Sequence, residues 1–583
     1  MAGSQWESPD FEPSLPVSEK SNPLTRDLDR ASPGRIVQML QACDAQMFQE
    51  DSGGIYQRLL SEGVVKTVME VAKRVEIILK GPEEGAIVLS GCGTSGRLAF
   101  LAASAFNREL RRLDRQPVYS YVIAGGDRAL FTSQEAPEDD AGLGVAGLEK
   151  VCEGKKQVLF IGISCGLSAP FVAGQLDFCL RRPEVYTPVL IGFNPATQAR
   201  SDPIPGCSFT FLSVVRRLQE RAETRDAFLL NPAVGPEAVS GSSRMKGGSA
   251  TKILLEAVLS AAHAAAFSHQ PVTFEGVLQH MRTYEEAFQR TYTHSEEIAA
   301  LVEAAGHSLR CGGTVCYLGW GSQALLGLID ASECNPTFGA DYKDIRGFIN
   351  GGYSSLNNNE GPLSDLGPEF LISHEDFLRL VLPGLTDRDT VVLLYSDADN
   401  LSQVVATARR VREKTRGVHA VWHHAEGNES EEQDAVHQLC LSTLSIAWPP
   451  HSSLHMQWEL STKLVLNAVS TGAHVLKGKV FRNYMVDVQV TNSKLYGRAA
   501  RLLQILSGFP ESRCEDALLK VIHRVDGVSG DIAVHTAAAR SREKVVPLAL
   551  LCLLTGCSLE EAESCLRRQP IVREAVEAFI QNK

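Results

Sequence analysis

The sequence contains few of the patterns that mark exported, membrane-spanning, metal-binding or nucleic-acid-binding proteins. Its first 30 residues hold no apolar run, which argues against a secretory signal, and no uncharged apolar stretch reaches the ~20 residues that cross a bilayer. None of its 14 cysteines forms a C-x-x-C pair, so we expect neither a zinc ribbon nor a thioredoxin-like redox motif. No block of lysine and arginine offsets the net charge of −12, which argues against binding to nucleic acid.

The bulk composition is that of an ordinary folded protein. Of the 583 residues, 44% are hydrophobic and 22% are charged. At ~100–200 residues per domain, this length predicts three or four structural units. Most cysteines lie in apolar stretches, which is typical of reduced thiols in the core of an intracellular protein. We expect no metal, no cofactor, and no membrane or nucleic-acid partner.

Short apolar segments alternate with longer helical stretches in two successive parts of the chain. The segments are rich in β-branched residues and are bounded by glycine, proline or polar turns. They cover residues 86–90, 118–123, 158–163 and 188–193, and then residues 315–318, 391–395, 418–422 and 444–448. Continuous apolar strands that alternate with helices predict a parallel sheet with helices on both faces.

Two internal matches indicate that this α/β unit is duplicated. Residues 252–263 match residues 463–474, and residues 91–95 match residues 319–323. After about residue 492 only helical spacing remains. We therefore predict an α/β protein with two tandem doubly wound parallel-sheet domains and a C-terminal all-α lid. The predicted units are an N-terminal arm and helical cap (1–74), a first domain (75–290), a second domain (291–490) and the lid (491–583).

Two loops rich in glycine and hydroxyl residues each join a predicted strand to a helix. The candidate ligand-binding residues are Gly93, Thr94 and Ser95 in the first loop, and Ser164, Cys165, Gly166 and Ser168 in the second. Loop amides and helix N-termini favour anions, and the carboxyl edge of an open parallel sheet is where ligands bind. The pair therefore predicts a phosphate cradle. Neither loop is a Walker loop or a G-x-G-x-x-G, so a nucleotide is not implied, and a plain glycine turn is the alternative for each.

Charged residues near these loops extend the candidate site. Arg244 precedes a long helix and could reach an anion, although the preceding serines, including Ser243, could simply cap that helix. Glu138 and Glu333 could act as general acid and base or accept hydrogen bonds from sugar hydroxyls. By residue type alone, a solvated surface carboxylate is the more usual role for Glu138.

Several motifs together resemble the sugar isomerase (SIS) domain family, and within it N-acetylmuramic acid 6-phosphate etherase and its animal relatives that regulate glucokinase. They lie at residues 18–25, 93–97, 124–128, 163–171, 241–252, 338–341 and 459–479 and cover nearly the whole chain. The tandem arrangement favours the regulators, because the etherase carries one SIS domain per chain. The resemblance makes both predicted sheet domains SIS-type domains.

The resemblance also implies a role for individual residues. It assigns the phosphate and the sugar to Thr94, Ser95, Ser164, Gly166, Ser168, Ser243, Arg244 and Lys479. Glu138 and Glu333 fall where the etherase keeps its acid–base carboxylates. In the first half Ala105 stands in the place that Glu333 takes in the second, and in the second half residues 395–397 replace the serine cradle. One composite site is therefore expected, with a degenerate second site.

By resemblance, the function is that of a sugar-phosphate-sensing allosteric inhibitor of glucokinase. Fructose 6-phosphate would promote inhibition and fructose 1-phosphate would relieve it, without catalysis by the chain itself, in the nucleus and the cytoplasm. The alternative is an etherase-like lyase, or another SIS-type enzyme, that uses Glu138 and Glu333. The segment after Trp448 is shorter and more polar than in the family, and its candidate anchors for glucokinase are Leu454, Met456 and Trp458.

Overall fold

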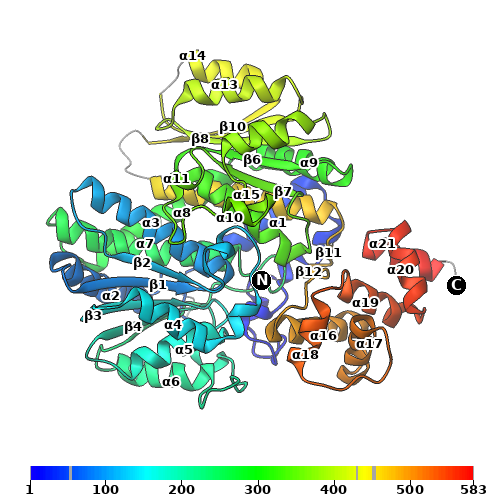
Figure 1. Ribbon diagram of the computed structural model, residues 1–583, viewed down its shortest axis with the longest axis horizontal. Coiled ribbons are helices and arrows are strands. Elements are labelled where there is room, and N and C mark those ends of the chain that lie inside the picture. Colours follow the sequence, from blue (N-terminus) through cyan, green and yellow to red (C-terminus); the bar gives the residue numbers. More distant parts are fainter. Residues whose placement is uncertain (1, 51–55, 428–430, 450–454, 582–583) are drawn as a thin grey trace.

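The computed structural model describes residues 2–50, 56–427, 431–449 and 455–581 (Figure 1). Two five-stranded parallel sheets form the body of the protein. The first contains β1 (Gly85–Gly91), β2 (Tyr119–Ile123), β3 (Gln157–Ile163), β4 (Tyr186–Ile191) and β5 (Phe228–Leu230) in the order β2-β1-β3-β4-β5. The second contains β6 (Val315–Gly319), β7 (Ile345–Ile349), β8 (Thr390–Ser396), β9 (Val418–Ala425) and β10 (Ser442–Trp448) in the order β10-β9-β8-β6-β7.

The two sheets share one topology, which confirms the predicted duplication. If β6 takes the place of β1, the order of the second sheet repeats that of the first, read from its other edge. Two of the ten strands were not predicted. β5 is only three residues long, and Arg346 interrupts the apolar run of β7. A two-stranded hairpin, β11 (Val480–Phe481) and β12 (Tyr484–Met485), leads to the C-terminal helices.

Alternating side chains of the strands pack into separate apolar layers. In β1, Ile87 and Leu89 join the large cluster that spans both domains, whereas Ala86 and Val88 join the outer layer of the first domain. The large cluster is formed mainly by α1 (Pro33–Asp44), α2 (Glu62–Lys80), α3 (Gly93–Arg112), α7 (Lys246–Phe267), α8 (Phe274–Tyr292), α9 (Ser295–Arg310), α10 (Gly321–Phe338) and α15 (His455–Leu476). The outer layers are formed by α4 (Ala141–Val151), α5 (Pro170–Leu180) and α6 (Phe211–Ala222), and by α13 (Leu401–Arg412) and α14 (Glu431–Leu439).

Helix α7 contacts α2, α3 and α8 inside the protein. Among the described residues it is the single helix that is long and apolar enough to cross a membrane, and 72% of its apolar window is buried. The bent pair of α19 (Val545–Thr555) and α20 (Leu559–Arg568) passes the same test when it is counted as one span.

The N-terminal arm consists of short 3-10 turns that pack against the first domain. Trp6, Val17 and Leu28 are fully buried there, so the arm is a part of the folded body. At the other end, α16 (Ser493–Ser507), α17 (Glu511–His523), α18 (Ile532–Ala539), α19, α20 and α21 (Val572–Gln581) surround an apolar cluster of their own. This helical unit, orange to red in Figure 1, lies beside the arm and is the predicted lid.

Candidate functional site

A cavity lies where the carboxyl ends of β1 and β3 meet α10 and the first turn of α16. The empty space between its walls and its open mouth is about 750 Å³. The structure brings together eleven of the twelve residues predicted to bind the ligand: Gly93, Thr94, Ser95, Glu138, Ser164, Cys165, Gly166, Ser168, Ser243, Arg244 and Glu333. The first domain, the second domain and the lid all contribute to its wall, so the cavity depends on how these three units are placed.

The loop between β1 and α3 is held close to the sheet. Gly93 has a φ of +51°, a left-handed conformation that glycine adopts without strain. A Cβ on Gly96 would lie 2.5 Å from Ile123 Cγ1, so glycine is needed for the helix to approach the neighbouring strand. The two positions set the start of α3 at the cavity, where Thr94 and Ser95 present hydroxyl groups.

The loop between β3 and α5 turns around the hydroxyl of Ser164. Its Oγ accepts hydrogen bonds from the backbone N–H groups of Ser168 (3.1 Å) and Ala169 (3.3 Å). Asn194 Nδ2 also donates to the carbonyl of Gly166 (3.0 Å), which fixes the middle of the loop. Because Ser164 Oγ accepts both bonds, its own proton can be donated into the cavity.

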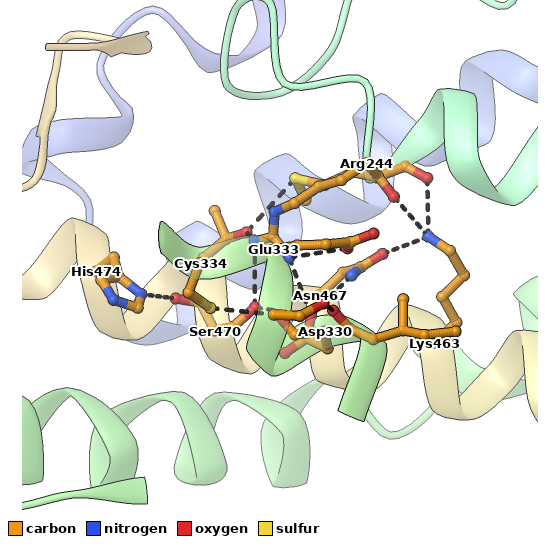
Figure 2. A network of polar contacts seen from close by, with 12 residues as sticks. Arg244, Asp330, Glu333, Cys334, Lys463, Asn467, Ser470 and His474 are labelled. Carbon is orange, nitrogen blue, oxygen red and sulfur yellow. Dashed lines mark hydrogen bonds and ion pairs between the residues drawn. The ribbon is translucent and has the colours of Figure 1, made fainter. Parts of the chain in front are cut away.

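Arg244 is held rigidly by the second domain (Figure 2). Its Nη1 donates to Asp330 Oδ1 (3.0 Å), and its Nη2 donates to Ser470 Oγ (3.1 Å) and Thr471 Oγ1 (2.6 Å). The side chain is 3% exposed. Arg244 therefore adds fixed positive charge to the cavity wall and ties the first domain to α10 and α15, while both terminal nitrogens are already used within the protein.

Lys463, at the start of the repeated helix segment, holds the backbone of Arg244 in place. Its Nζ donates to the carbonyls of Arg244 (2.8 Å) and Met245 (3.1 Å), and to Asn467 Oδ1 (2.7 Å). All three ammonium protons are satisfied, and burial lowers its pKa. Lys463 belongs to the repeated segment found in the sequence. The repeat did not indicate, however, that its side chain lies behind Arg244 in the cavity wall.

Glu333, from α10, is buried in the wall of the cavity, 2% exposed, and neither carboxylate oxygen has a hydrogen-bond partner among the described residues. Arg244 Nη1 lies 3.9 Å from its Oε2. Burial raises the pKa of Glu333, although the charges of Arg97, Arg244 and Lys463 and the nearby hydroxyl of Thr94 oppose this. A buried carboxylate with so few donors is costly, so a ligand that offers hydroxyl groups would satisfy it.

Glu138 is buried as well, which differs from the surface position that is usual for its residue type. It is 5% exposed and lies 2.7 Å, through its Oε1, from Nζ of Lys494 in the lid. Burial alone would lower the pKa of Lys494, but the Glu138 carboxylate raises it above its usual value. This ion pair joins the first domain to the lid at the rim of the cavity.

The residues that the lid contributes were not predicted from the sequence. Lys494, Leu495 and Arg498 all line the cavity from the first turns of α16. Arg498 is held by Glu19 of the N-terminal arm, with Nη2 at 2.6 Å and Nε at 3.1 Å from the carboxylate. A lysine and an arginine four residues apart lie on one face of a helix, but that spacing is too common to indicate a site.

One of the twelve residues predicted to bind the ligand lies outside the cavity. Lys479 does not line it and instead pairs with Asp487 at 2.6 Å. Of the candidate anchors for glucokinase, Trp458 is 6% exposed and packs against His423 and Trp448, so its side chain is not presented at the surface. Met456 is half-buried against the large cluster, and Leu454 lies outside the described residues.

No group of three or more His, Cys, Asp or Glu side chains is placed to hold a metal ion within the part of the chain that the structure describes. The chemistry of the cavity comes from hydroxyls, backbone amides, two lid cations, the buried side chains of Arg97 and Arg244, and buried carboxylates. Such a set can bind a dianionic phosphate at one end and hydroxyl groups at the other.

We expect Lys494→Gln to weaken sugar-phosphate binding by about 10- to 100-fold, because a charge-assisted contact contributes about 1.5–3 kcal/mol. The matched control is Lys477→Gln. Lys477 also lies 2.7 Å from a carboxylate, that of Asp344, and is similarly exposed (26% against 28%), but it does not line the cavity. Calorimetric titration of both variants with phosphorylated hexoses checks this; equal losses would show that the lid lysine has no special part in binding.

The comparisons with known proteins cover nearly the whole chain. Family models match residues 70–180 (glucokinase regulatory protein N-terminal SIS domain), 292–477 (glucokinase regulatory protein, second SIS domain) and 482–576 (C-terminal lid domain of glucokinase regulatory protein). The glucokinase regulatory protein of Xenopus laevis is 48% identical over 98% of this chain and 94% of its own length, and that of Homo sapiens is 46% identical over 99% and 94%. N-acetylmuramic acid 6-phosphate etherase 1 of Bacillus licheniformis is 32% identical over 41% of this chain and 73% of its own length.

Proposed function

The chain belongs to the glucokinase regulatory protein family, and on that premise we propose that it regulates glucokinase in response to a phosphorylated sugar bound in the cavity. It acts as a regulatory protein and not as a catalyst. The full-length similarity to proteins that bear this name supports regulation of glucokinase. The observation that supports a sugar phosphate is the cavity itself, where two hydroxyl-bearing loops face buried carboxylates and two lid cations.

The proposed effectors are fructose 6-phosphate, which promotes inhibition, and fructose 1-phosphate, which relieves it. Two ligands of one site can have opposite effects only if each stabilises a different state of the protein. The two states would differ in the position of the lid. Its cations Lys494 and Arg498 line the cavity, yet they are paired with Glu138 and with Glu19, which lie outside the lid.

The sensing role is tested with purified glucokinase and each sugar phosphate in turn. We expect inhibition of glucokinase that fructose 6-phosphate strengthens and fructose 1-phosphate relieves. Inhibition that neither sugar alters would contradict the proposed sensing of sugar phosphates. No effect on glucokinase at any concentration would contradict glucokinase as the partner. The same experiment examines the altered segment after Trp448, because the resemblance assigns the contact with glucokinase to that segment and residues 450–454 lie outside the described part of this chain.

One feature supports the alternative of etherase-like chemistry. Both Glu138 and Glu333 line the cavity, and burial raises the pKa of Glu333, as a general acid requires. Turnover of a muramic acid 6-phosphate ether by the purified chain, lost in Glu333→Gln, would establish the enzyme. We propose residence in the nucleus and the cytoplasm, which imaging of the tagged chain in cultured cells would test.

A further inference from the structure

The second domain keeps the backbone framework of the phosphate cradle. The registers of β1 with β3 and of β6 with β8 are equivalent, since Gly91 pairs with Ile163 and Gly319 with Leu394. The helices that follow, α5 and α13, then begin at the same distance beyond the paired residue. Gly321 at the start of α10 has a φ of +54°, as Gly93 has +51° at the start of α3.

Residue by residue, this register shows what has changed in the second cradle. Tyr395 stands where the first domain has Ser164, and Asp399 stands where it has Ser168. Tyr395 is fully buried, so it cannot serve a ligand at the surface of the loop. Asp399 is partly exposed and remains at the mouth of the cradle.

The space above the two helix-starting glycines differs accordingly. A Cβ placed on Gly93 would meet no atom of the described residues within 4 Å, because the cavity is open there. A Cβ placed on Gly321 would lie 2.9 Å from Asp399 Oδ1. In the second domain a carboxylate thus lies over the start of the helix at the place where the first domain is empty.

Hydrogen bonds hold the Asp399 carboxylate in this place. Its Oδ2 accepts from the backbone N–H of Ser396 (2.8 Å) and from Ser396 Oγ (2.9 Å). Asp399 is not needed to cap the helix that follows it. The side chain of Asn400 caps α13, because it accepts a hydrogen bond from the backbone N–H of Gln403. The carboxylate lies instead at the start of α10, whose N-cap residue Trp320 makes no side-chain cap.

We propose that the Asp399 carboxylate is a built-in substitute for the phosphate of a ligand and closes the second cradle. The cradle of the second domain can still bind an oxyanion, but the Asp399 carboxylate permanently occupies the place where one would bind. The chain therefore takes one phosphorylated sugar, a consequence that rests on the proposed function. The oxyanion capacity of the second cradle does not depend on that function.

The test replaces Asp399 by the residue that the first domain has in that place. We expect Asp399→Ser to gain a second, weaker site for inorganic phosphate, so that the stoichiometry in calorimetry rises from one to two. A crystal of this variant soaked in phosphate should show the ion beside Gly321. Asp399→Asn is the matched control: its amide fills the same volume without the charge, and the stoichiometry should stay at one.

The same substitution in a variant with a blocked first cradle distinguishes phosphate binding in the second cradle from binding in the first. In Ser164→Asp the first cradle is blocked, so phosphate should not raise the thermal midpoint of that variant, whereas it should do so in Ser164→Asp combined with Asp399→Ser. Phosphate in the first cradle but never beside Gly321 would overturn the proposal and leave the sugar site intact. Phosphate beside Gly321 with an empty first cradle would instead support this proposal and contradict the proposed sugar site.

Discussion

Replacing Ser164 by aspartate is expected to abolish sugar-phosphate binding. Ser164 is 5% exposed and its hydroxyl lies in the cradle wall. Two like unit charges ~4 Å apart repel by about 4 kcal/mol at an effective dielectric constant of ~20. That energy corresponds to a loss of roughly a thousandfold in affinity, which places the variant beyond ordinary calorimetric detection. Titration with fructose 1-phosphate and with fructose 6-phosphate measures the loss directly.

The substitution should leave the fold intact, which makes its effect interpretable. The role of Ser164 Oγ within the protein is to accept two backbone N–H groups, and a carboxylate can accept them too. The second domain carries an aspartate, Asp399, in a cradle of the same framework, at the place of Ser168 and with its own hydrogen bonds to Ser396. We therefore expect an unchanged thermal midpoint in the absence of ligand.

The control for Ser164→Asp is Ser512→Asp. Ser512 is exposed in the first turn of α17, where a negative charge is tolerated by the helix dipole. This variant should bind both sugar phosphates as the unchanged protein does, and it should inhibit glucokinase equally. If Ser164→Asp also retained its affinity, the phosphate would lie elsewhere in the protein.

The cradle was predictable from the sequence because its signals are local. Each loop follows a continuous apolar strand, and glycine and hydroxyl residues occur within a few positions of the strand end. Parallel strands bring such loops to one edge of the sheet, so neighbouring strands suffice to place Ser95 and Ser164 together. The repeated segments then predicted a second sheet of the same topology.

The lid residues were not predictable in this way, because their position depends on tertiary packing. Nothing near Lys494 in the sequence distinguishes it from a surface lysine, and its part in the cavity follows from the docking of α16 against Glu138. Lys479 shows the converse. The resemblance assigned it to the ligand, whereas Asp487, eight residues later, folds back in the hairpin region and pairs with it. Ionic partners of this kind follow from the fold and not from a local pattern.

The buried network behind the cavity should make Asp330→Ala the most destabilising single change proposed. Asp330 Oδ1 accepts from Arg244 Nη1 (3.0 Å), Asn467 Nδ2 (2.9 Å) and Ser470 Oγ (2.9 Å). Both members of the Arg244–Asp330 pair are 3% exposed. Removing one member of a buried pair leaves an uncompensated charge, which costs about 3–5 kcal/mol. We expect the midpoint of thermal unfolding to fall by several degrees Celsius.

Because Arg244 joins the two SIS domains through this network, the same change should also loosen the cavity and reduce sugar-phosphate affinity. The control is Asp526→Ala, which removes the partner of Lys520 in an exposed pair at 2.9 Å and should shift the midpoint little. Replacing both charges, as in Arg244→Met with Asp330→Leu, should recover part of the lost stability but not the binding, because the arginine is then no longer left without its partner, whereas Glu333 loses its neighbouring cation. If Asp330→Ala matched the surface control, the network would not be what holds the two domains together around the site.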